Sequence, residues 1–378
     1  MKEFIGNDSI KNLQKILKKN NFKNIFYITS NSPLEKSNID KVREIIKKES
    51  NFFHFNDIVP TPTVQGVNQA LKLFNKGTYD LIIAMGGGSV LDIGKSVSIL
   101  STNGGNVEDY LLKNMKIKRN GIPLILIPTT AGTGSEATHF AVIFIGKTKY
   151  SLDDPKLIHA DYAIVDPKLT YSLPKRVTAY TGMDALSQGI ESYWNINSTD
   201  ESREYAKKAI KLVMENLSNA VHNPNEESRY NMAIAANYAG KAINITKTTA
   251  CHAISYPITA YFNVPHGHAV ALTLPSMIIF NSEVNDIDVL DPRGVAYVKD
   301  IMNKLISLLG VSSFIEAKEE IRDLMKKIGL ETRLEDLGIK TQDNIETIIK
   351  NGFNPERVKN NPRLLSEFQL RKILEEIK

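Results

Sequence analysis

Apolar runs rich in β-branched residues alternate with helical patterns through the first 165 residues, and this alternation constrains the fold more than any other feature. Three apolar runs that lead into loops cover 24–30, 79–89 and 122–138, and helical patterns cover 36–48, 60–77 and 89–101. Continuous apolar strands separated by helices indicate a parallel sheet that is covered on both faces. We therefore predict an α/β dinucleotide-binding domain over 1–172.

The pattern changes after the Pro167–Pro174 segment. From there to the end the sequence has helical periodicity and almost no strand signal, as in RVTAYTGMDALSQGIESYW and SREYAKKAIKLVMENLSNAV. A chain of 378 residues also exceeds what one core usually organises. We therefore predict a second, all-helical domain over 173–378.

Composition excludes several classes of protein. The formal net charge is only +5, and the lysines are scattered instead of forming one basic run, which argues against a nucleic-acid partner. The single cysteine, Cys251, excludes an internal disulfide and fits a reducing compartment. No secretory signal is visible, and no apolar run approaches the roughly 20 residues that cross a bilayer. We expect a cytoplasmic protein with no membrane segment.

Two glycine-rich loops follow two of the predicted strands. MGGGS, residues 85–89, opens a helix, and glycines there let a phosphate approach backbone N–H groups and the positive helix end. PTTAGTGSEAT, residues 128–138, is a second Gly/Thr loop after another strand. Because ligands of parallel sheets bind at the carboxyl ends of the strands, both loops are expected to contact one nucleotide. For each loop taken alone, the alternative to a phosphate-binding role is a tight turn that is only structural.

The helical half contains a candidate metal site. Asp184 and Gln188 are four residues apart and share one face of a helix. Three of the seven histidines, His252, His266 and His268, fall within seventeen residues. A lone histidine is usually a solvated or core residue, but two histidines and an aspartate on apolar helices are better explained as converging ligands.

The motifs GGGSVLDIGK, PTTAGTGSEAT, TGMDAL and PHGHA, in this order and spacing, resemble the iron-containing (group III) alcohol dehydrogenase family over nearly the whole chain. The resemblance implies NAD(P)-dependent interconversion of a small alcohol and its aldehyde, and a homodimer. It also implies a divalent metal, Fe or Zn, held by Asp184, Gln188, His252 and His266. Tyr256 or His268 would relay the proton. The implied cofactor contacts are Gly87, Gly88, Ser89, Asp92, Thr129, Thr130, Thr133 and Lys149.

Gln188 departs from the family pattern, because a histidine ordinarily stands there. An amide oxygen binds Fe²⁺ or Zn²⁺ more weakly than an imidazole nitrogen does. Loss of the metal is one interpretation. Because the three other ligands are present, we expect instead that a metal is retained.

The segments KYSL, DALSQGIESYW and HGHAVALTLP resemble the branch of this family that reduces phosphonoacetaldehyde to 2-hydroxyethylphosphonate. A dianionic substrate would need cations or N–H donors, for which His268, Lys147 and His139 are candidates. The alternatives are a dehydrogenase of another small alcohol, a synthase that uses NAD only transiently, and a non-catalytic nucleotide-binding paralogue.

The end of the first strand bears on the choice of cofactor. NAD-preferring domains place an acidic residue there for the ribose 2′-hydroxyl. This chain has Ser30 and Asn31 at that point. Without a carboxylate to repel a 2′-phosphate, NADPH is an acceptable cofactor.

Overall fold

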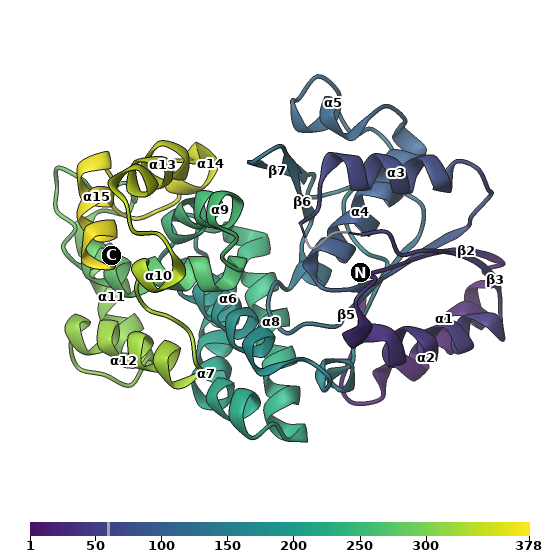
Figure 1. Ribbon diagram of the computed structural model, residues 1–378, viewed down its shortest axis with the longest axis horizontal. Coiled ribbons are helices and arrows are strands. Elements are labelled where there is room, and N and C mark those ends of the chain that lie inside the picture. The colour runs from purple at the N-terminus through teal and green to yellow at the C-terminus, as the bar shows by residue number, and fades with distance from the viewer. Residues whose placement is uncertain (59–60) are drawn as a thin grey trace. The chain divides into compact units, whose positions relative to one another are not determined.

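The computed structural model of the protein describes residues 1–58 and 61–378. They form two compact units, Met1–Leu173 and Pro174–Lys378, and Figure 1 shows strands only in the first of them. The predicted fold class, an α/β domain followed by helices, is confirmed.

The first unit is built on a six-stranded parallel sheet with the strand order β1-β8-β5-β4-β2-β3. A separate antiparallel hairpin, β6–β7, was not predicted. The strands are β1 Lys2–Ile5, β2 Asn24–Thr29, β3 Asn51–Phe55, β4 Leu81–Gly86, β5 Leu124–Pro128, β6 Phe140–Ile145, β7 Thr148–Asp153 and β8 Tyr162–Val165.

Helices cover both faces of this sheet, as Figure 1 shows with α3 on one side and α1 and α2 on the other. Alternate residues of β2 face opposite layers: Phe26 packs in the core beneath α3 and α4, and Tyr27 packs in the core with α1 and α2. The helices are α1 Asn12–Asn20, α2 Lys36–Lys47, α3 Val64–Phe74, α4 Gly88–Asn103 and α5 Val107–Leu111. The helix predicted over 60–77 is α3, and its first predicted residue, Pro60, lies outside the described residues.

All regular elements that the structure describes in the second unit are helices. The central one, α6, is buried almost continuously from Gly182 to Trp194 and packs against α7, α8 and α10. The helices are α6 Lys175–Trp194, α7 Asp200–His222, α8 Glu226–Thr246, α9 Ala250–Phe262, α10 His266–Ser282, α11 Val295–Leu308, α12 Phe314–Lys327, α13 Gln342–Gly352, α14 Pro355–Val358 and α15 Glu367–Glu376.

No helix in the described residues has the combination of length and apolarity that crossing a bilayer requires.

Candidate functional site

Three of the predicted metal ligands meet in the second unit. Asp184 on α6, His252 on α9 and His266 at the start of α10 each offer a ligand atom, and these atoms lie within 4.8 Å of one another. Asp184 and His252 are buried and His266 is half-buried. One carboxylate oxygen and two imidazole nitrogens at this spacing form a donor set for a divalent transition metal.

A glycine allows α10 to reach the aspartate. A Cβ atom built on Gly267 would lie 2.0 Å from the Tyr180 carbonyl oxygen and 2.8 Å from Cβ of Asp184. Any side chain at this position would therefore push α10 away from α6. The PHGHA motif places a ligand, His266, beside the residue that makes the close helix contact possible.

His252 is held in one orientation by a carboxylate that was not predicted from the sequence. Its Nδ1 is hydrogen-bonded to Oε2 of the buried Glu191, and its Nε2 lies 3.4 Å from Oδ1 of Asp184. Burial alone would lower the pKa of His252, but Glu191 and Asp184 outweigh it and raise that pKa to about 9. The second nitrogen of a metal-binding histidine is commonly fixed by a carboxylate in this way.

Glu191 is itself held by a network of donors. Its Oε1 accepts hydrogen bonds from the backbone N–H groups of Thr249 and His252, both at 3.2 Å, and from the Thr249 hydroxyl at 2.7 Å. The indole Nε1 of Trp194 donates to that hydroxyl at 3.1 Å. A sequence signal existed, because Glu191 follows Asp184 by seven residues and shares its helix face.

Gln188 fits the role of a fourth ligand. It lies one turn after Asp184 on α6 and is only 3% exposed. Its Oε1 has no hydrogen-bond partner among the described residues. A buried carbonyl oxygen without a donor is costly unless something binds it, and a cation beside Asp184 would do so.

The two predicted proton-relay residues lie in different surroundings. The ring of Tyr256 stacks on that of His266, with 6.2 Å between centroids, so its phenol is close to the ligands. His268 is fully buried, and its Nε2 is 2.7 Å from the backbone carbonyl of Glu331. Burial lowers the pKa of His268. His268 therefore contacts the loop at Glu331, and it is not part of the ligand cluster.

The first unit assembles the two glycine-rich loops at the carboxyl ends of adjacent strands. Gly87 is the N-cap of α4, and Gly88 and Ser89 begin that helix after β4. A Cβ atom on Gly88 would lie 2.8 Å from the side chain of Thr133, so the second loop packs directly on the first. Thr129 and Thr130 follow β5, which pairs with β4.

Asp92 and Lys95, which form a buried ion pair on α4 with 3.6 Å between Oδ1 and Nζ, fasten the second loop to that helix by hydrogen bonds. Asp92 accepts hydrogen bonds from the Ser135 hydroxyl at 2.6 Å and from the Val142 N–H at 3.0 Å. Lys95, whose role was not predicted from the sequence, donates hydrogen bonds of 2.8 Å to the hydroxyls of Ser135 and Thr138 and to the carbonyl of Phe140. Asp92 thus shapes the loop, and its predicted cofactor contact stays a prediction.

The remaining candidates in the first unit belong to the hairpin. Lys149, a predicted cofactor contact, is a half-buried residue of β7. Lys147 lies at the exposed turn between β6 and β7. The imidazole of His139 lies 3.2 Å from the carboxylate of Asp153. His139 is therefore engaged within the hairpin.

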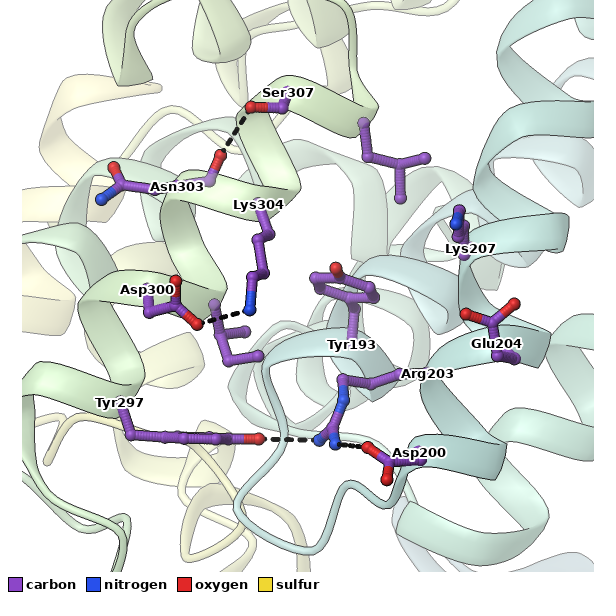
Figure 2. Close-up of a pocket in the computed structure, with 12 residues that line it drawn as sticks. Tyr193, Asp200, Arg203, Glu204, Lys207, Tyr297, Asp300, Asn303, Lys304 and Ser307 are labelled. Atoms are coloured by element: carbon purple, nitrogen blue, oxygen red, sulfur yellow. Dashed lines mark hydrogen bonds and ion pairs between the residues drawn. The ribbon is translucent and has the colours of Figure 1, made fainter.

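A pocket of about 930 Å³ in the second unit shares no lining residue with the ligand cluster. Residues of α6, α7 and α11 line it, and Figure 2 shows two ion pairs among them. Arg203 pairs with Asp200, and Lys304 donates to Asp300 at 2.6 Å. This pairing is typical of a solvated polar groove, and nothing in it selects a ligand.

Comparison with known protein families covers both units. The family model for iron-containing alcohol dehydrogenase matches residues 2–167. The model for the C-terminal part of the Fe-containing alcohol dehydrogenase family matches residues 178–378.

Individual relatives agree with the family models. Long-chain-alcohol dehydrogenase 1 of Geobacillus thermodenitrificans is 33% identical over 362 residues, which is 93% of this chain and 89% of that protein. Phosphonoacetaldehyde reductase of Streptomyces viridochromogenes is 35% identical over 240 residues, 61% of this chain and 60% of that protein. The crystal structure of sulfoacetaldehyde reductase from Bifidobacterium kashiwanohense in complex with NAD⁺ matches with a TM-score of 0.89 at 29% identity. That match covers 100% of this chain and 96% of that one.

Proposed function

Because this chain belongs to the iron-containing alcohol dehydrogenase family, and so is an NAD(P)-dependent alcohol dehydrogenase or aldehyde reductase, we propose that it reduces a small anionic aldehyde. The best candidate is phosphonoacetaldehyde, which would be reduced to 2-hydroxyethylphosphonate with the help of a divalent metal.

The cluster of Asp184, His252 and His266 is the observation that carries this proposal. With the buried, partnerless Oε1 of Gln188, it supplies four donors from three helices. When bound, the metal would polarise a carbonyl oxygen as a Lewis acid, and the nicotinamide would supply the hydride.

The chain's own residues orient this site and handle the proton. Glu191 holds Nδ1 of His252 by a hydrogen bond, which turns Nε2 toward Asp184 and would make Nε2 the nitrogen that binds a metal. Tyr256, stacked on His266, is the proposed proton donor to the alkoxide as the alcohol forms. Burial of Asp184 and His252 keeps water from their donor atoms.

Two observations support an anionic substrate. Relatives named for phosphonoacetaldehyde and sulfoacetaldehyde are among the matches, and both compounds are two-carbon aldehydes with an anionic group. Gln188 also carries an amide N–H₂ group, which an imidazole ligand would lack. If its oxygen binds the metal, the N–H₂ can donate to a phosphonate oxygen.

A neutral alcohol or aldehyde is the second candidate. It is favoured by the similarity to long-chain-alcohol dehydrogenase 1, which extends over 93% of this chain.

The test is an aldehyde panel run alongside metal analysis of the purified protein. We expect phosphonoacetaldehyde and sulfoacetaldehyde to exceed butanal in kcat/KM by at least about tenfold, the value of one charge-assisted hydrogen bond. One NAD(P)H should be oxidised per aldehyde consumed, which separates a reductase from a synthase. Equal rates on all three would favour the neutral candidate. Binding of NAD(P)H with no turnover of any carbonyl would identify a non-catalytic paralogue.

The metal has its own test. His266→Ala should lower both the metal content and the rate, because it removes one ligand of the cluster. Full activity after exhaustive chelation would contradict a role for the metal.

A further inference from the structure

A buried carboxylate lies at the edge of the sheet where the cofactor loops begin. Glu35 ends the short 3₁₀ helix η2, Pro33–Glu35, and is only 7% exposed. Its Oε2 accepts a hydrogen bond from the Ser30 hydroxyl, and its Oε1 accepts one from the Thr129 hydroxyl. Glu35 thus connects Ser30, which is five residues away along the chain, with Thr129, which is 94 residues away.

The two hydroxyl donors place this carboxylate relative to the strands. Ser30 is the first residue after β2, and Thr129 is the first residue after β5. β4 lies between β2 and β5 in the sheet. The backbone N–H of Thr129 donates to the carbonyl of Gly86, the last residue of β4, at 3.0 Å. The carboxylate of Glu35 therefore spans the carboxyl end of β4, at the point where the chain enters the Gly87–Gly88 turn.

This placement changes the expectation for the cofactor. Dinucleotide-binding sheets that prefer NAD hold an acidic group at the end of the strand beside the glycine-rich turn, where it accepts a hydrogen bond from the ribose 2′-hydroxyl. The sequence has Ser30 at that point, from which we predicted that NADPH is acceptable. The fold brings the carboxylate of Glu35 to the hydroxyl of Ser30. We propose that Glu35 makes this protein selective for NAD(H) over NADP(H). The inference rests on the proposed use of a dinucleotide.

The physical reason is uncompensated charge. Among the described residues, no Lys or Arg side chain forms an ion pair with Glu35, and its two hydrogen bonds come from neutral hydroxyls. A 2′-phosphate carries about −1.5 to −2 charges at neutral pH and would be repelled by this carboxylate. A 2′-hydroxyl instead offers it a donor. Like charges brought together in a binding site repel each other, so discrimination against NADPH should be on the order of tenfold to a hundredfold.

The experiment measures the dissociation constants of NADH and NADPH from the fluorescence of the bound nicotinamide. We expect the unsubstituted protein to bind NADH at least about tenfold more tightly. Glu35→Gln keeps a side chain of the same shape and removes the charge, so it should lower the ratio of the two constants by about tenfold, mainly through tighter NADPH binding.

Glu44→Gln is the matched control. It removes the same charge from an exposed position of α2, where Glu44 pairs with Lys47 at 2.8 Å, and should leave the ratio unchanged. If Glu35→Gln does not fold, Glu35→Leu is a second variant that removes the same charge. The preference of the unsubstituted protein for NADH over NADPH can be measured without any variant.

Three results would overturn the inference: a preference for NADPH, an equal change in both variants, or binding of neither dinucleotide. The titration contains no aldehyde. A protein that binds NADH selectively and reduces no aldehyde would therefore refute the proposed function and leave this inference standing.

Discussion

Replacing Glu191 with glutamine should weaken metal binding although Glu191 is not itself a ligand. In the native arrangement three donors converge on Oε1, and Nδ1 of His252 donates to Oε2. A glutamine can keep its oxygen toward the three donors only by turning its N–H₂ group toward Nδ1. That nitrogen must then accept a hydrogen bond, so the proton of the neutral ring moves to Nε2, the atom that faces Asp184.

The magnitude follows from this exchange of tautomers. Binding a metal through Nε2 would require the proton to return to Nδ1, where it would oppose an amide N–H. Loss of such a supporting partner typically weakens metal affinity about 10- to 100-fold, or roughly 1.4–2.8 kcal/mol. Thr249→Val removes one donor to Oε1 and leaves the Glu191–His252 contact in place. Its effect should stay below about fivefold, the value of one ordinary hydrogen bond of about 1 kcal/mol.

The assay is competition for Zn²⁺ between the metal-free protein and a chelator of known affinity, with thermal unfolding followed in parallel. Thr249→Ser keeps the hydroxyl and should behave as the unsubstituted protein does. A folded Glu191→Gln variant whose Zn²⁺ affinity lies within twofold of the original would refute the tautomer argument. Equal losses in Glu191→Gln and Thr249→Val would show that the network only supports the fold.

Three further changes test other parts of the structure. Gln188→His should increase the Zn²⁺ or Fe²⁺ retained per chain and lower kcat/KM for anionic aldehydes by about ten- to a hundredfold. A variant that gains metal and speeds up equally on anionic and neutral aldehydes would contradict the proposal that the Gln188 amide donates a hydrogen bond to an anionic substrate. Gly267→Ala should reduce metal content and destabilise the fold by about 1–3 kcal/mol, because its Cβ would lie 2.0 Å from a backbone oxygen of α6. Gly352→Ala, whose Cβ would meet nothing closer than 3.5 Å, is the control, and equal metal loss in both would argue against the close-contact explanation. Gly88→Val should abolish NAD(P)H binding, since it would also displace Thr133 in the second loop; an unchanged cofactor titration would show that the loop is only a turn.

Local patterns were sufficient for the interior of the sheet. The strands predicted over 24–30, 79–89 and 122–138 contain β2, β4 and β5, because a strand buried on both faces must be apolar throughout. The pairing of β1 with β8 was not predictable in the same way. β1 is only four residues long, is partly exposed, and pairs with a segment about 160 residues away. Nothing in its own sequence specifies that partner.

Motifs in the sequence predicted the three residues that form the cluster, whereas the residues that support the two candidate sites were not predicted. Glu191 gains its role from the backbone at Thr249, which folds back onto α6. Lys95 reads as an ordinary helix lysine until the second loop packs over it. Glu35 lies five residues after Ser30, the position where an acidic residue was sought. In each case a partner comes from a distant segment. Helix periodicity places Glu191 on the same face as Asp184, but it does not identify Thr249 or His252 as the partners of Glu191.

The hydrogen-bonded chain from Trp194 through Thr249 and Glu191 to His252 gives the protein a built-in optical probe. Trp194 is the only tryptophan in the sequence, so all indole emission comes from one buried position on α6. Its N–H contacts the hydroxyl that supports the carboxylate behind a metal ligand. Filling the cluster with a spectroscopically silent ion such as Zn²⁺ should therefore be visible in the native fluorescence, and occupancy could be followed in real time without a label.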